Sequence, residues 1–138
     1  MEAVRTGRWA LFVLLCAARA GGCEALTPKN PVKVSAACGY AEDSVGGRIA
    51  DLDLKLVTSD QTTVSEVHTD AKGNFRFATL QLGTYVMTSG TPGWTLDGWP
   101  IRIMSSESDT KCKRPLIVRP SLAGCGGSAS KKGYRPKF

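Results

Sequence analysis

The central part of the chain alternates between apolar and polar positions with a period of two. In "RIADLDLKLVTS", Leu52, Leu54 and Leu56 alternate with charged residues, and in "GNFRF" the side chains of Phe75 and Phe77 are expected to point the same way. Alternation of this kind is typical of a β-strand with one buried face and one solvated face. The apolar side of each segment therefore predicts a strand surface that faces a core.

Seven such segments, separated by turns rich in Gly, Asp, Ser and Pro, occur along the chain. One turn precedes Phe75, where Asp70 is placed to hydrogen-bond its own backbone and Gly73 to adopt a positive φ. Short strands at this spacing predict an all-β fold, an antiparallel β-sandwich of about seven strands. The expected strands cover residues 34–41, 48–59, 62–69, the segment around Phe75 and Phe77, and residues 84–90, 100–104 and 115–120.

The first 20 residues are predicted to be a secretory signal peptide. Two arginines precede an apolar run at residues 9–18, which ends in an A-x-A sequence at residues 18–20. The run is shorter than the roughly 20 residues that a transmembrane helix needs. Cleavage is expected after Ala20, with Ala25 as the alternative. The mature protein is expected to be secreted or to lie in the periplasm or cell envelope.

The predicted organisation is a signal peptide at residues 1–20, a linker at 21–33, a β-sandwich at 34–125 and a basic disordered tail at 126–138. The net charge of +6 lies at the two ends, because the tail has four basic residues and no acid while the body is near neutral. A nucleic-acid-binding domain carries basic and aromatic side chains on the fold itself. No specific nucleic-acid partner is therefore predicted, and the tail is expected to attract acidic polymers only weakly.

The cysteines fit an exported protein. Cys16 leaves with the signal peptide, and Cys23, Cys38, Cys112 and Cys125 form an even set suited to an oxidising compartment. One pairing joins Cys112 to Cys125 across a short strand and turn. The alternative joins Cys38 to one of these two, and spacing alone does not decide between them.

Cys23 has a second candidate role. The sequence Ala20-Gly21-Gly22-Cys23 resembles a bacterial lipobox, with Ala rather than Leu three positions before the cysteine. Lipid on Cys23 would tether the protein to a membrane, and this is the one route by which a membrane partner is expected.

No metal site is predicted. The chain lacks a C-x-x-C pair, the usual unit of a zinc–thiolate site. Asp43, Asp51 and Asp53 are oxygen donors of the kind that Ca²⁺ prefers. Their alternate positions along a strand more simply predict a solvated face.

The stretch "TDAKGNFRFATLQLGTY" at residues 69–85 and the strand before it resemble the carboxypeptidase regulatory-like domain, a transthyretin-like (prealbumin-like) β-sandwich of secreted and envelope proteins. The resemblance covers residues 34–90. Arg48 and Asp51 depart from it, because they stand where the family often has proline and glycine. The matching positions are Gly39, Ala41, Asp43, Gly46, Ile49, Leu52, Leu54, Leu56, Thr69, Asp70, Gly73, Phe75, Phe77, Leu80, Gly83 and Tyr85.

The resemblance implies three chemistries to weigh. Isopeptide-bond formation lacks its acid, since Thr88 and Ser89 stand where the acid is expected, and a dioxygenase iron site needs two histidines. The third is that of the transthyretin-related hydrolases, which use histidines, an arginine and a C-terminal Tyr-Arg-Gly-Ser. The chain matches this ending in part from Tyr134 to Lys137, and its one histidine is His68. Such hydrolysis needs a constellation of acid–base groups, and no serine here has a G-x-S-x-G elbow. No catalytic residue and no cofactor are predicted.

Trp94 and Trp99 are the candidate ligand-binding residues, in the connection "GTPGWTLDGWP". Exposed in a loop, they would stack on a sugar or insert into a partner, whereas folded inward, as we expect, they would cap the core. The chain is thus predicted to be a non-enzymatic secreted or cell-envelope module that binds a protein, peptide or glycan at the cell surface. The alternatives are a transthyretin-related hydrolase-like oligomer and a lipid-anchored accessory subunit of an envelope assembly.

Overall fold

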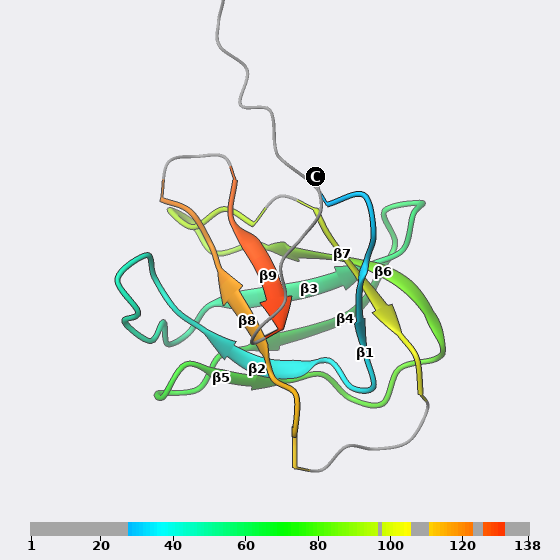
Figure 1. Cartoon of the computed structure of the whole chain (residues 1–138). Helices are drawn as coiled ribbons and strands as arrows, with labels where there is room; N and C mark the ends of the chain where they lie inside the picture. Colours follow the sequence, from blue (N-terminus) through cyan, green and yellow to red (C-terminus); the bar gives the residue numbers. More distant parts are fainter. Residues whose placement is uncertain (1–27, 97, 106–110, 123–125, 132–138) are drawn as a thin grey trace, which may run out of the picture.

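The computed structural model describes residues 28–96, 98–105, 111–122 and 126–131, which form two stacked β-sheets (Figure 1). The prediction of an all-β sandwich is confirmed. In these ranges the strands are β1 (Val32–Val34), β2 (Cys38–Ala41), β3 (Asp53–Val57), β4 (Thr63–His68), β5 (Asn74–Arg76), β6 (Gly83–Ser89), β7 (Trp99–Ile103), β8 (Leu116–Arg119) and β9 (Ser128–Lys131).

Both sheets are mixed rather than purely antiparallel. The five-stranded sheet has the order β1-β7-β6-β3-β4, and the four-stranded sheet has the order β5-β2-β8-β9. β1 pairs in parallel with β7, and β2 pairs in parallel with β8. These parallel pairs arise because the strand expected at residues 34–41 is two strands, and the chain passes from one sheet to the other between them.

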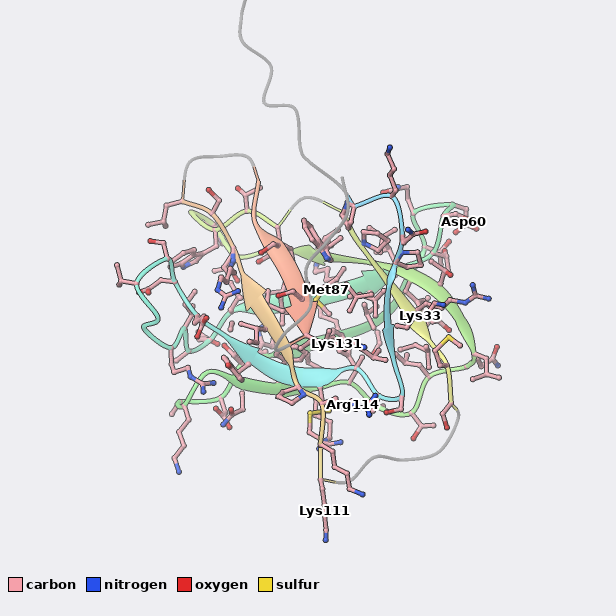
Figure 2. The ribbon with its side chains drawn as sticks, in the orientation of Figure 1. Lys33, Asp60, Met87, Lys111, Arg114 and Lys131 are labelled. Atoms are coloured by element: carbon pink, nitrogen blue, oxygen red, sulfur yellow. A yellow bond between two sulfur atoms is a disulfide. The ribbon has the colours of Figure 1, made fainter. Side chains whose placement is uncertain are left out.

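The apolar side chains meet between the sheets, as the alternation predicts. Leu52, Leu54 and Leu56 are fully buried. Met87, labelled near the centre of the molecule in Figure 2, is also fully buried. The rings of Phe75 and Phe77 pack edge to face, with their centroids 5.9 Å apart. At roughly 25 cal/mol per Å² of buried apolar surface, this interface is the main source of stability.

Thr69 fastens the end of β4 to the segment that leads into β3. Its buried hydroxyl donates to the carbonyl of Ile49 at 2.7 Å and accepts from the N–H of Leu52 at 2.8 Å. Its backbone pairs with the same segment, since the N–H of Asp51 donates to the Thr69 carbonyl and the N–H of Thr69 donates to the Leu52 carbonyl. One side chain therefore satisfies two backbone groups away from the regular ladder of the sheet.

The turn that follows Thr69 is the predicted one. Gly73 has a φ of +76° and donates its N–H to the Asp70 carbonyl at 2.9 Å. The carboxylate of Asp70 accepts from the N–H groups of Asn74 and Lys72, which stabilise its charged form and hold the pKa of Asp70 below its ordinary value. The Gly73 carbonyl accepts from the N–H of Ala41, so the turn is also tied to β2.

At two positions of the pattern that resembles the related family, the backbone geometry explains which residue is present. A Cβ atom on Gly39 would lie 1.9 Å from the carbonyl oxygen of Leu116, so the parallel pairing of β2 with β8 requires glycine there. Asp51, which stands where the related family often has glycine, has a φ of +57°. Aspartate is one of the few residues besides glycine that adopt this left-handed conformation readily.

A disulfide joins Cys38, at the start of β2, to Cys112, which lies before β8, with their Cα atoms 6.0 Å apart. The sequence leaves two possibilities open: Cys112 with Cys125, or Cys38 with one of these two. The structure has the second, with Cys112 as the partner of Cys38, and this excludes a bridge between Cys112 and Cys125. The Cys38–Cys112 bridge closes a loop with a sequence separation of 74, for which the chain-entropy model gives about 4 kcal/mol of stabilisation. Cys23 and Cys125 lie outside the described residues.

Two expected boundaries are wrong. The linker predicted at residues 21–33 contains the start of β1, and the tail predicted at residues 126–138 contains β9. β9 has the sequence SASK, in which Ala129 is fully buried and provides the one apolar side chain. Such a strand has almost no hydrophobic signal of its own, and it forms by antiparallel pairing with the apolar strand β8. The predicted signal peptide lies outside the described residues.

We expect Thr69→Val to lower the free energy of unfolding by about 2–4 kcal/mol, because two buried backbone groups lose their partner at a cost of about 1–3 kcal/mol each. Thr69→Ser is the control, since it keeps the hydroxyl and should cost about 1 kcal/mol or less. Urea denaturation followed by tryptophan fluorescence measures both. Equal stability of the two variants would contradict the role given to the hydroxyl.

Candidate partner-binding site

Trp99 belongs to the core. It is the first residue of β7, its side chain is 3% exposed, and it packs in the cluster between the two sheets. Its indole N–H is buried and has no hydrogen-bond partner among the described residues. Trp99 is folded inward as expected, and this burial leaves no ring face for stacking on a ligand.

Trp94 lies in the connection between β6 and β7 and is half-buried against the core. The backbone around it is held in place, because the Trp94 N–H donates to the Thr91 carbonyl at 3.1 Å. The next residue, Thr95, exchanges two backbone hydrogen bonds with Ser121, both of 2.8 Å. The exposed part of the Trp94 ring is therefore presented by a fixed segment.

Trp94 lines an open hollow of about 490 Å³ at one end of the sandwich. The segments that form the hollow are the turn after β2, the β6–β7 connection, the chain after β8 and the beginning of β9. The lining residues that matter most are Trp94, Asp43, Ser44, Arg119, Pro120 and Leu122.

One unusually exposed apolar side chain lines this hollow, and a second follows a lining residue in the sequence. Leu122 is 71% exposed, and Val45, the residue after Ser44, is 88% exposed. Leu122 and the half-buried ring of Trp94 both line the hollow, and we call these two apolar side chains the Trp94 surface. Contiguous apolar groups with a polar surround are typical of interaction sites.

The charged groups of the hollow are already paired within the domain. The carboxylate of Asp43 accepts from the N–H groups of Val45 and Gly47, at 3.0 and 2.7 Å. The guanidinium of Arg119 pairs with the carboxylate of Glu42. These contacts fix the turn and the rim, and they leave the apolar side chains as the groups most accessible to a ligand.

A second hollow, of about 240 Å³, has a basic lining. Lys33 of β1, Arg114 before β8 and Lys131 of β9 surround it, together with the half-exposed side chain of Met104. Figure 2 labels the three basic residues on the side of the molecule where β1 and β9 lie near each other. No acidic side chain among the described residues lines this hollow. Its positive potential favours anions in general.

Of the other candidate residues, Asp53 of β3 and His68 of β4 stand opposite each other, and the remainder do not join them. His68 is exposed at the end of β4, where it lines a separate open hollow. Asp43, Asp51 and Asp53 do not form one ligand cluster in the described part of the chain. The C-terminal sequence that matched the hydrolases in part, residues 134–137, lies outside the described residues.

A family model for the second β-sandwich domain of the BOS complex subunit NOMO1-like matches residues 41–119, more than half of the chain. The chain belongs to this NOMO1-like family. The match runs from the end of β2 to the end of β8, so the NOMO1-like region includes the turn before β5 and both tryptophans. No curated protein matches the chain. The match agrees with the β-sandwich implied by the sequence pattern, whereas the carboxypeptidase regulatory-like name stays a prediction.

The disulfide bears on where this NOMO1-like chain resides. Disulfides persist in oxidising environments, so the Cys38–Cys112 bridge fits an extracellular or luminal location. Within the described ranges, the structure contains no helix that is long and apolar enough to cross a membrane.

We expect the two tryptophans of the NOMO1-like domain to differ sharply in their effect on stability. Trp99→Ala should lower the free energy of unfolding by about 3–5 kcal/mol, as large-to-alanine changes in a core do. Trp94→Ala should cost about 1 kcal/mol, a typical value for a single substitution. Chemical denaturation followed by circular dichroism measures both. Similar losses for the two variants would show that Trp94 is also a core residue.

Proposed function

We propose that the chain is an exported, non-enzymatic module of a protein assembly and that it binds a polypeptide segment of a partner at the Trp94 surface. The observation that carries the proposal is the hollow lined by Trp94 and by the exposed side chain of Leu122. Aromatic side chains at the centre of an interface contribute a large share of binding energy.

The lining of the hollow supports a peptide more than a glycan. A sugar needs polar groups that are free to hydrogen-bond its hydroxyls, whereas Asp43 and Arg119 are engaged in contacts within the domain. Trp94 and Leu122 offer apolar contact, which suits an aliphatic or aromatic side chain of a partner protein. The hollow of about 490 Å³ has room for one or two such side chains.

Membership of the NOMO1-like family supports the proposal that the chain works as part of a protein assembly. The matched family is described as a subunit of the BOS complex, and a domain of such a subunit is suited to contacts with other polypeptides. The expected signal peptide and the Cys38–Cys112 bridge support export from the cytosol. In this proposal the core provides stability alone, and no reaction takes place at the domain.

Capture of partners by the mature chain tests the proposal. The tagged wild-type protein, W94A, L122S and L82S are compared by quantitative mass spectrometry of co-purified proteins. L82S is the matched control, because Leu82 is 61% exposed but does not line the hollow. Capture should fall by about tenfold or more in W94A and L122S, as expected for interface residues worth about 2 kcal/mol or more, and should be unchanged in L82S.

The proposal fails if W94A and L122S, folded as judged by circular dichroism, capture the same proteins as the wild type in the same amounts. It also fails if L82S reduces capture as strongly as L122S does. In that case general surface hydrophobicity, rather than the Trp94 surface, would explain the association.

A further inference from the structure

Three metal-ligating side chains gather on the outer face of the five-stranded sheet. Asp53 comes from β3, and Glu66 and His68 come from β4. One ligand atom of each lies within 4.8 Å of the ligand atoms of the other two. The register of the antiparallel pair explains the cluster, because Asp53 stands opposite His68 and Lys55 stands opposite Glu66.

The separations suit a small divalent ion. Zinc binds imidazole nitrogen and carboxylate oxygen at about 2.0–2.2 Å, so its ligand atoms lie about 3–4 Å apart. Glu66 and His68 are exposed, so a change of side-chain rotamer would close the remaining gap. An imidazole ligand and only two carboxylates favour zinc over calcium, which takes about six to eight oxygen ligands.

Asp53 provides a second, independent observation that favours a cation at this place. Its side chain is 14% exposed, and its Oδ1 atom is buried and has no hydrogen-bond partner among the described residues. A buried carboxylate oxygen without a partner is unfavourable, and a bound cation would satisfy it.

The turn after β6 packs against Asp53. The Asp53 N–H donates to the hydroxyl of Thr91 at 2.6 Å, and a Cβ atom on Gly90 would lie 2.5 Å from Asp53 Oδ2. The turn after β6 therefore lies close against one side of the carboxylate.

Lys55 is the cation that the structure places between the two acids. Its Nζ atom lies 3.5 Å from Asp53 Oδ2 and 3.5 Å from Glu66 Oε2. These two carboxylates, Asp53 first, raise the pKa of Lys55 above its ordinary value. One ammonium neutralises only half of the charge of two carboxylates. Exposed pairs of this kind contribute little to stability, so the ammonium is easily displaced.

We propose that Asp53, Glu66 and His68 form a zinc-binding site that links β3 and β4, with Lys55 as the competing cation. The fourth position of the ion is left to water. The site is distinct from the Trp94 surface and does not depend on it. It departs from the sequence prediction of no metal, because its ligands become neighbours only through the pairing of the two strands.

Calorimetric titration of the full chain, free of any histidine tag, with zinc chloride tests the site. H68Q and E66Q should weaken binding by about tenfold or more, a loss that even outer-shell partners of metal ligands produce. K55M should tighten binding, because it removes the competing ammonium. D60N is the control, since Asp60 is an exposed acid in the β3–β4 turn, and it should bind zinc as the wild type does.

X-ray absorption at the zinc edge identifies the ligands. The expected coordination sphere contains only nitrogen and oxygen at about 2.0–2.1 Å, whereas sulfur at about 2.3 Å would assign the ion to cysteine thiolates. The proposal is overturned by sulfur ligation, by absence of binding at millimolar zinc, by unchanged affinity in H68Q, or by K55M binding no more tightly than the wild type.

Discussion

The hydroxyl of Thr69 holds the junction between β3 and β4, from which the chain continues into the opposite sheet. It joins the carbonyl of Ile49 to the N–H of Leu52, at the place where the chain enters β3 and leaves β4. This junction sets the register of β3 against β4 and begins the turn that carries the chain to β5 in the opposite sheet. The Ile49 carbonyl and the Leu52 N–H are buried at this junction. An apolar residue in place of Thr69 would leave both groups without a hydrogen-bond partner, which is unfavourable.

The two proposed binding sites lie at the surface of the β-sandwich rather than in its core. The Trp94 surface is made by connections at one end of the sandwich, and the proposed zinc ligands lie on the solvated face of β3 and β4. Loops and solvated faces tolerate exposed and unusual side chains because the core supplies the stability. The Cys38–Cys112 bridge adds to that stability by tying β2 to the segment before β8.

Much of the fold follows from local patterns, and the remainder follows from pairing between distant segments. The alternation of Leu52, Leu54 and Leu56 correctly predicts a strand with one buried face, and Asp70 and Gly73 correctly predict a turn. The change of sheet within residues 34–41 has no local signal, because both halves look like strand. β9 has only small and polar residues, so its pairing with β8 decides its structure. The candidate sites are less predictable still, since sequence periodicity does not distinguish the buried Trp99 from the half-buried Trp94.

The most direct test of partner binding at the Trp94 surface is to place a photo-activated cross-linker on each side of the domain in cells that produce it. Position 44 lines the hollow beside Trp94, and position 60, labelled on Asp60 in Figure 2, lies in the β3–β4 turn. We expect a covalent product with one partner protein from position 44 and no such product from position 60. The same product from both positions, or from position 60 alone, would contradict the assignment of binding to the Trp94 surface.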